Sequence, residues 1–174
     1  MKKIFVGIFT LFLSFNTIAQ TCLPGSIKAT TSTSRIIDNS DGTVLDIETG
    51  LMWDKCSIGQ FYSPDDNRCD GEAQIFSSWQ ESLVTVVSIN GADGRAGYTD
   101  WRLPNIKELA SIIERQCVNP VVNLDVFPDT PSQTYFSSTP QDNALVPGQS
   151  INFFDGQEVS SAPERIGRLV RDID

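Results

Sequence analysis

The stretch Gly97-Tyr98-Thr99-Asp100-Trp101-Arg102-Leu103-Pro104-Asn105-Ile106-Lys107-Glu108-Leu109 predicts a short strand that leads directly into a helix. Successive side chains of a strand point to opposite faces, so Trp101 and Leu103 would share the buried face. Arg102 would point the other way, where it can pair with an acid. We therefore expect this motif to specify the fold, with a mainly structural role for Asp100, Trp101, Arg102, Leu103 and Pro104.

The helix that follows this motif is predicted to start at Asn105. Pro104 ends the strand, and Asn105 with Glu108 three positions later is typical of a helix N-cap. The apolar positions then predict a buried side made of Leu109, Ile112 and Ile113, and Asn119-Pro120 would stop the helix.

An earlier helix is predicted from Ser78 onward. Ser78-Trp79-Gln80-Glu81 matches a capping box, in which the serine accepts an amide hydrogen bond and Glu81 reaches back. Helical spacing then gives one mostly apolar face, made of Trp79, Leu83, Val86, Val87 and Asn90. Three glycines between 91 and 97 break this helix into a loop.

Short strands are predicted on both sides of the two helices. Asp41-Gly42 is typical of a tight hairpin turn, followed by a strand over 43–47 and a returning strand over 51–53 that ends at Trp53. Further strands are expected over 135–138, 151–154, 157–159 and 166–171. Helices early in the chain and strands at both ends indicate an α+β fold. Bringing the first and last strands together would also set the two termini close.

The N-terminus has the features of a secretory signal peptide over residues 1–19. Lys2 and Lys3 precede a twelve-residue apolar stretch, and Ala19 offers a small residue at the cleavage position. The stretch is too short for a membrane span, which needs about 20 residues. We expect an N-terminal arm over 20–34, one domain over 35–174, no membrane span after cleavage, and a location in the periplasm, outside the cell or on its surface.

The four cysteines predict two disulfides in an oxidising compartment. Three connectivities are open, and we favour Cys56–Cys69, which closes a short polar loop, and Cys22–Cys117, which would hold the arm. A zinc site is disfavoured because the chain has no Cys-x-x-Cys and no histidine. A catalytic thiol lacks a histidine partner for the same reason.

The chain is acidic, and this excludes some classes of partner. Its formal charge is −9, and removal of Lys2 and Lys3 with the signal peptide would make it −11. Such a charge argues against nucleic acid and anionic membranes as partners.

The chain resembles the Lcl C-terminal domain family of bacteria over about 35–171. The 97–109 stretch carries the resemblance most strongly, supported in order by 38–44, 49–53, 79–83, 123–128, 135–139 and 169–171. The resemblance implies a C-type-lectin-like fold with two helices and short, loop-rich antiparallel strands. The family is named after a domain of a collagen-like adhesin that forms trimers and binds sulfated glycans. This chain is acidic and has no Gly-X-Y tract, so that ligand is not carried over, and a homo-trimer stays an open alternative.

Two kinds of residue are candidates for a binding surface. An acidic cluster containing Asp65 and Asp66 lies in the loop that Cys56–Cys69 would close. Aromatic residues in or near loops can form sugar-stacking platforms, and they are Phe61, Tyr62, Tyr98, Tyr135, Phe153 and Phe154. From these two groups we select Tyr62, Asp65, Asp66, Tyr98, Tyr135 and Phe154. Phe153 and Phe154 are adjacent on a predicted strand, so one should face each side.

The acidic turn holding Asp38, Asp41 and Asp46 is a weak calcium candidate, because calcium prefers carboxylate oxygens. Its spacing does not match an EF-hand, and a hairpin turn is the better interpretation. The chain also lacks the Glu-Pro-Asn and Gln-Pro-Asp triplets of calcium-dependent lectins. We expect no cofactor and no metal.

The sequence favours a binding module over an enzyme. Glu108 and Glu114 are the conceivable acid pair, but they lie six apart on one predicted helix and would not face each other. We expect an exported module that recognises glycans or a partner protein at the cell envelope or surface. The alternative is a structural subunit of an envelope or pilus-like assembly, followed by a carboxylate-based enzyme that acts on envelope polymers.

Overall fold

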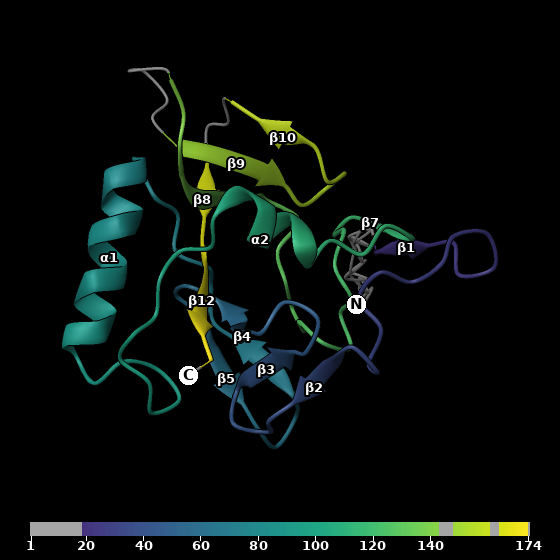
Figure 1. The fold of residues 1–174 in the computed structure, drawn as a ribbon, viewed down its shortest axis with the longest axis horizontal. Coiled ribbons are helices and arrows are strands. Elements are labelled where there is room, and N and C mark those ends of the chain that lie inside the picture. The colour runs from purple at the N-terminus through teal and green to yellow at the C-terminus, as the bar shows by residue number, and fades with distance from the viewer. Residues whose placement is uncertain (1–18, 143–147, 161–163, 174) are drawn as a thin grey trace, which may run out of the picture.

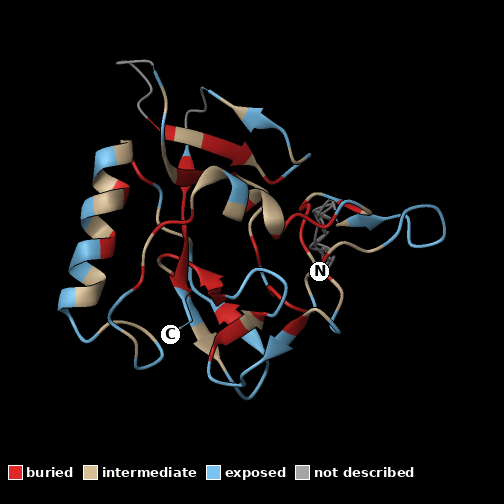
Figure 2. Cartoon of the chain, in the orientation of Figure 1, coloured by how far each residue is buried: buried red, intermediate tan, exposed pale blue. Residues whose placement is uncertain are grey.

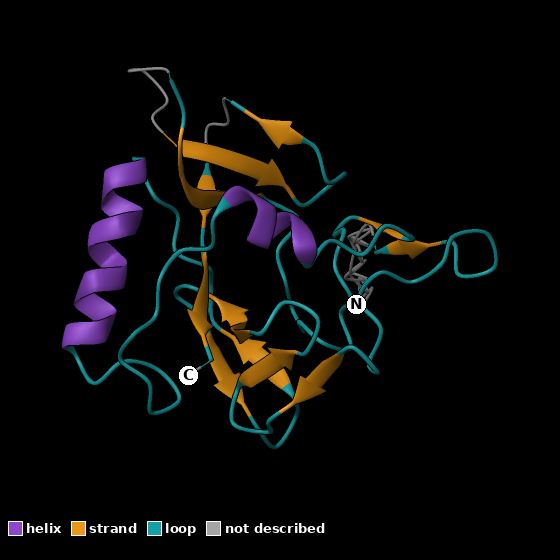
Figure 3. Cartoon of the chain, viewed as in Figure 1, coloured by secondary structure: helices purple, strands orange, loops and turns teal. Residues whose placement is uncertain are grey.

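The domain combines two helices with small sheets (Figure 1). The computed structural model describes residues 19–142, 148–160 and 164–173, so the predicted signal peptide lies outside it except for Ala19. The helices are α1 (Trp79–Gly91) and α2 (Ile106–Ser111), and loops join most of the elements (Figure 3). Within the described ranges, neither helix has the length and apolar character needed to cross a membrane. The α+β class is confirmed.

The main sheet is antiparallel and has the order β12 (Arg168–Asp172), β4 (Leu51–Ser57), β3 (Thr43–Asp46) and β2 (Ile36–Asp38). The predicted hairpin at Asp41-Gly42 joins β2 to β3. The sequence predicts that the first strand of the 35–174 domain lies together with the last strand. These strands are β2 and β12, and they are not neighbours in the sheet. They belong to one sheet, but β3 and β4 lie between them. The reason is that β2, β3 and β4 pair in chain order, and β12 adds at the free edge of β4.

The central strand β4 is buried over all seven residues (Figure 2). Leu51 and Trp53 pack into one hydrophobic cluster with Leu109 of α2. Met52, on the opposite face, packs into a second cluster with Val86 of α1. Burial on both faces explains why β4 begins with three consecutive apolar residues, Leu51–Trp53, where a half-exposed strand would alternate.

The second sheet has the order β10 (Glu158–Val159), β9 (Gly148–Asn152), β8 (Thr134–Pro140) and β11 (Arg165–Ile166). The β8–β9 and β9–β10 pairs are antiparallel, as expected. β11 is parallel to β8, which the expected antiparallel arrangement missed. Only Gly167 separates β11 from β12, so a single pass of the chain joins the two sheets.

Helix α1 starts as predicted but presents a narrower apolar face. Ser78 is its N-cap and accepts from the Glu81 amide at 3.1 Å, whereas the Glu81 carboxylate reaches one residue further back, to the amide of Ser77. Val87 is 72% exposed, contrary to the prediction. The Asn90 side chain bonds both backbone polar groups of Trp101, which turns the face of Val86 inward and leaves Val87 outside.

The Asp100–Pro104 motif has the predicted structural role, although its strand is reduced to one bridge between Arg102 and Val170. Trp101 and Leu103 are buried. Arg102 lies on the other side, where its bonds to Glu108, together with Asp172, raise its pKa. The Asp100 carboxylate pairs with Arg171 at 2.7 Å. Asn105 and Glu108 form a complete capping box at the start of α2.

The N-terminal arm is held along its length. Its strand β1 (Thr21–Cys22) pairs with β7 (Cys117–Val118), and Cys22–Cys117 forms the predicted disulfide. Gln20 donates to the carbonyls of Pro120 and Val122 at 2.7 Å.

The other end of the arm is held by Glu114. Its buried carboxylate accepts from the amide and hydroxyl of both Thr30 and Thr31. Burial opposes ionisation of Glu114, but these bonds outweigh it and lower the pKa. Glu114 is therefore a structural residue.

Glu114→Ala is expected to release the second half of the arm. Hydrogen bonds to a charged acceptor contribute about 1.5–3 kcal/mol each, so the Thr30 and Thr31 amides should exchange with deuterium at least about tenfold faster. Hydrogen exchange followed by mass spectrometry measures this. The exposed Glu72→Ala is the matched control, and unchanged exchange in the Glu114 variant would contradict this account of the arm.

Candidate functional site

Four segments far apart in the sequence surround a cavity of about 410 Å³. This volume falls within the range of small-molecule sites, about 300–1,000 Å³. The segments are the β2–β3 turn, β4, the hairpin of β5 (Phe61–Ser63) and β6 (Arg68–Asp70), and the loop after α1. The lining residues are Ser40, Asp41, Gly42, Asp54, Phe61, Tyr62, Pro64, Gly94, Arg95 and Ala96. The lining combines aromatic rings with both signs of charge.

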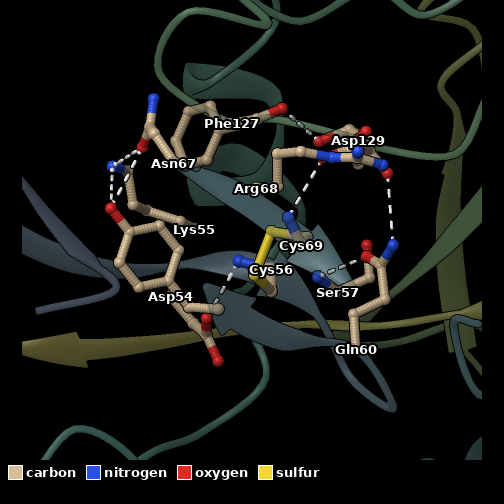
Figure 4. The surroundings of a disulfide bond; sticks show 12 residues. Asp54, Lys55, Cys56, Ser57, Gln60, Asn67, Arg68, Cys69, Phe127 and Asp129 are labelled. Carbon is tan, nitrogen blue, oxygen red and sulfur yellow. Dashed lines mark hydrogen bonds and ion pairs between the residues drawn. A yellow bond between two sulfur atoms is a disulfide. The ribbon is translucent and has the colours of Figure 1, made fainter. Parts of the chain in front are cut away.

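Asp54 on β4 supplies a buried carboxylate to this cavity and is 4% exposed. Its Oδ1 accepts from the Cys56 amide at 2.9 Å, as Figure 4 shows. Its Oδ2 lies 2.9 Å from Arg95 Nε, as an ion pair without an aligned hydrogen bond. Burial raises the pKa of Asp54, and the Arg95 charge and the Cys56 amide oppose that rise.

Arg95 is placed by the loop between α1 and the Asp100–Pro104 motif. Its backbone N–H and C=O both bond Tyr98, and the Trp101 indole donates to its carbonyl at 3.0 Å. Gly94 has a φ of 69°, and a Cβ there would lie 1.8 Å from the Tyr98 carbonyl oxygen, so the turn requires glycine. Arg95 Nη2 donates to the Gln60 carbonyl at 2.6 Å. The fold-specifying tryptophan thus also positions a residue of the cavity.

Tyr62 forms a rigid wall of the cavity. Its ring lies against Gly42, where an added Cβ would come within 3.1 Å of the ring. Behind it, the fully buried Lys55 donates to Asp38 at 2.7 Å, to Asn67 at 2.6 Å and to the Tyr62 hydroxyl at 3.3 Å. The Lys55–Asn67 bond is visible in Figure 4.

The hairpin that carries the aromatic residues is anchored beside the cavity. It consists of β5 (Phe61–Ser63) and β6 (Arg68–Asp70), and the predicted Cys56–Cys69 disulfide ties it to β4. Asp129 accepts from the Cys69 amide at 3.0 Å and lies 3.6 Å from Arg68 (Figure 4). These contacts limit the movement of the hairpin relative to the sheet.

Phe61 is the exposed aromatic residue of the lining. It is 71% exposed, and the Arg95 guanidinium lies 6.0 Å from its ring centroid. An exposed ring beside fixed polar groups can stack against the apolar face of a ligand.

Arg168 supports Asp54 and Lys55 from within the core. The buried guanidinium donates to their carbonyls and to the Thr130 hydroxyl, and it lies 4.8 Å from the Phe127 ring. Burial lowers its pKa. Arg168 therefore fixes the backbone on which the Asp54 side chain stands.

The model of the Lcl C-terminal domain matches residues 42–171, about three quarters of the chain. The chain belongs to the Lcl C-terminal domain family. No curated protein matches it. No solved structure matches it either. The match covers the cavity from Gly42 onward and both helices, whereas the arm with Cys22 precedes it.

The predicted binding residues divide within this Lcl C-terminal domain. Tyr62 lines the cavity, and so do Asp41 and Gly42 of the hairpin motif. Asp65 and Asp66 are exposed at the tip of the β5–β6 hairpin and are not part of the lining.

Two other predicted binding residues, Tyr98 and Phe154, do not line the cavity. Tyr98 packs edge-on against Trp101 at 6.2 Å and under Arg171 at 4.3 Å. Phe154 is 49% exposed near the β9–β10 turn, and Phe153 is buried, so the expectation that they face opposite ways is confirmed.

The prediction of Tyr135 as a binding residue is wrong. Its side chain is fully buried and stacks on Phe153 with 4.1 Å between the ring centroids. Its hydroxyl bonds the Ser57 hydroxyl at 2.8 Å. Tyr135 belongs to β8, an inner strand of the second sheet, so its ring lies in the core and not in a loop as the sequence suggested.

The three calcium candidates do not converge. Asp38 pairs with Lys55, Asp41 accepts from the Thr43 amide and hydroxyl, and Asp46 pairs with Arg35 at 2.5 Å. Burial opposes ionisation of Asp46, but the Arg35 and neighbouring hydrogen bonds lower its pKa. Across the ranges that the structure describes, no three cysteine, aspartate or glutamate residues are grouped to hold a metal.

Asp54 and Arg95 are the functional candidates that the sequence analysis missed. An acid and a lysine interrupting an apolar run after Trp53 could have drawn attention to Asp54. Arg95 carries no local signal, because only the Gly94 turn and the Trp101 indole place it in the cavity.

Proposed function

We propose that this Lcl C-terminal domain is an exported binding module, and that the cavity around Asp54, Arg95, Phe61 and Tyr62 is its contact site for a glycan or a surface protein. The carrying observation is an exposed aromatic ring beside a fixed acid–guanidinium pair. The two disulfides support export to the periplasm, the cell surface or the medium. We further infer a C-type-lectin-like fold, which the family membership implies.

The proposal does not include an enzymatic activity. Glu108, one member of the conceivable acid pair, bonds Arg102 and the Asn105 amide. Glu114, the other member, bonds the arm. Both carboxylates have structural partners, which supports binding as the function of the domain.

A structural subunit of an envelope assembly is the competing function. The observation that favours it is the pair of exposed apolar residues Val84 and Val87 on the outer side of α1. Light scattering would report the mass in solution. A trimer or larger assembly that binds no glycan supports this alternative, and a monomer argues against it.

Phe61→Ala is expected to weaken glycan binding at least about tenfold. Burying a phenylalanine side chain contributes about 1.5–3 kcal/mol, and each 1.4 kcal/mol is a factor of ten. A glycan array identifies a binding oligosaccharide, and calorimetry then compares the affinities of the variants for it. Phe154→Ala is the matched control, since Phe154 is also exposed but outside the lining. If Phe154→Ala loses binding and Phe61→Ala retains it, the binding site does not lie at the cavity, and this proposal is wrong.

A further inference from the structure

We propose that the cavity selects uncharged sugars over sulfated or carboxylated ones, because Asp54 neutralises the Arg95 guanidinium that faces the ligand. This inference rests on the proposed binding function and adds the class of ligand to it. Three features of the cavity carry it.

The first feature is a donor with spare hydrogen-bonding capacity. Arg95 Nε faces Asp54 and Nη2 donates to the Gln60 carbonyl. Among the residues that the structure describes, Nη1 of Arg95 has no hydrogen-bond partner. Its two N–H groups can therefore donate to a hydroxyl or carbonyl oxygen of a ligand. The guanidinium is held on two sides, which reduces the entropy lost when it binds.

The second feature is the neutralisation of that donor. Asp54 Oδ2 lies 2.9 Å from Arg95 Nε and is itself buried, so little of the interaction is screened by water. Burial raises the pKa of Asp54, whereas the ion pair with Arg95 and the hydrogen bond from the Cys56 amide favour its carboxylate form. Asp54 is thus a positioning residue for Arg95, and it cancels the charge that would attract an anion.

The third feature is the balance of the remaining lining. Asp41 is exposed and binds Thr43 through Oδ1, which leaves Oδ2 to accept from a ligand hydroxyl. The charged lining residues are Asp41, Asp54 and Arg95, with a formal sum of −1. An acceptor, a donor and the exposed Phe61 ring suit an uncharged sugar, whereas an anionic group would meet net repulsion.

The test compares matched pairs of sugars. Neutral galacto-, gluco- and manno-oligosaccharides are each assayed beside their monosulfated forms by array and calorimetry. The intact domain should bind the neutral member at least about tenfold more tightly, with little change between about 0.05 and 0.5 M NaCl. Asp54→Asn leaves the Arg95 charge uncompensated, so the neutral-to-sulfated affinity ratio should fall at least about tenfold.

Two further variants separate this role from a general effect on folding. Asp46→Asn removes the acid from the buried Arg35–Asp46 pair outside the lining and should leave the ratio unchanged. Asp41→Asn, at an exposed position, should also shift the ratio toward the sulfated member and provides the test should Asp54→Asn not fold. A preference of the intact domain for sulfated sugars at the cavity would overturn the inference while the binding function stands. Binding of no sugar at all would overturn both the inference and the glycan function.

Discussion

Replacing Cys22 and Cys117 together by alanine is expected to lower the free energy of unfolding by about 4–5 kcal/mol. The disulfide joins residues 95 positions apart. A cross-link that closes a loop of about 100 residues removes about 4.7 kcal/mol of chain entropy from the unfolded state. Because β1 has only two residues, the backbone pairing with β7 cannot replace the covalent link. Guanidinium denaturation under non-reducing conditions measures the loss.

Leu23→Ala is the matched control for the disulfide variant. Leu23 follows Cys22 in the same arm and its side chain is exposed, so its loss should change stability by no more than about 0.5 kcal/mol. A loss below about 1 kcal/mol for the disulfide variant would contradict the view that the arm is an integral part of the domain.

Arg168→Met is expected to lower the free energy of unfolding by about 3–5 kcal/mol. Methionine fills much of the space but cannot donate, so the buried carbonyls of Asp54 and Lys55 and the Thr130 hydroxyl lose their donor. Each unsatisfied buried polar group costs about 1–3 kcal/mol. Relief from burying the guanidinium offsets part of this cost. Thermal and chemical denaturation measure the net effect.

The exposed Arg115→Met controls for loss of an arginine as such and should be nearly neutral. Equal stability of Arg168→Met and the unchanged domain would mean that the desolvation cost of the guanidinium cancels the free energy of its hydrogen bonds. That result would contradict the view that Arg168 stabilises β4. Ligand binding adds a second measurement, since a displaced β4 should also weaken binding at Asp54.

Local chemistry explains why much of the fold was predictable. The Asn105 capping box, the Ser78 cap and the Asp41-Gly42 turn each depend on neighbouring residues, and each formed at the predicted position. The two favoured disulfides also formed: Cys56–Cys69 ties the β5–β6 hairpin to β4, and Cys22–Cys117 holds the arm. Non-local pairing accounts for the errors. The parallel β11–β8 pair and the separation of β2 from β12 depend on how distant strands meet.

The candidate site was less predictable because its parts meet only in the folded chain. Tyr62 was recognised as an aromatic residue of a loop, and it lines the cavity. Tyr135 had the same local character but lies in the core. Asp54 and Arg95 come together because β4 is central and the Trp101 indole holds the Arg95 loop. Both contacts join residues that no local sequence motif connects.

We propose the cavity as the binding site of this Lcl C-terminal domain. Nuclear magnetic resonance of the ¹⁵N-labelled domain, titrated with a neutral oligosaccharide identified on the array, tests it most directly. The largest amide shifts are expected at the lining, at Gly42, Phe61, Tyr62 and residues 94–96. Saturable shifts confined to the outer side of α1 or to the region of Phe154, with none at the lining, would contradict it.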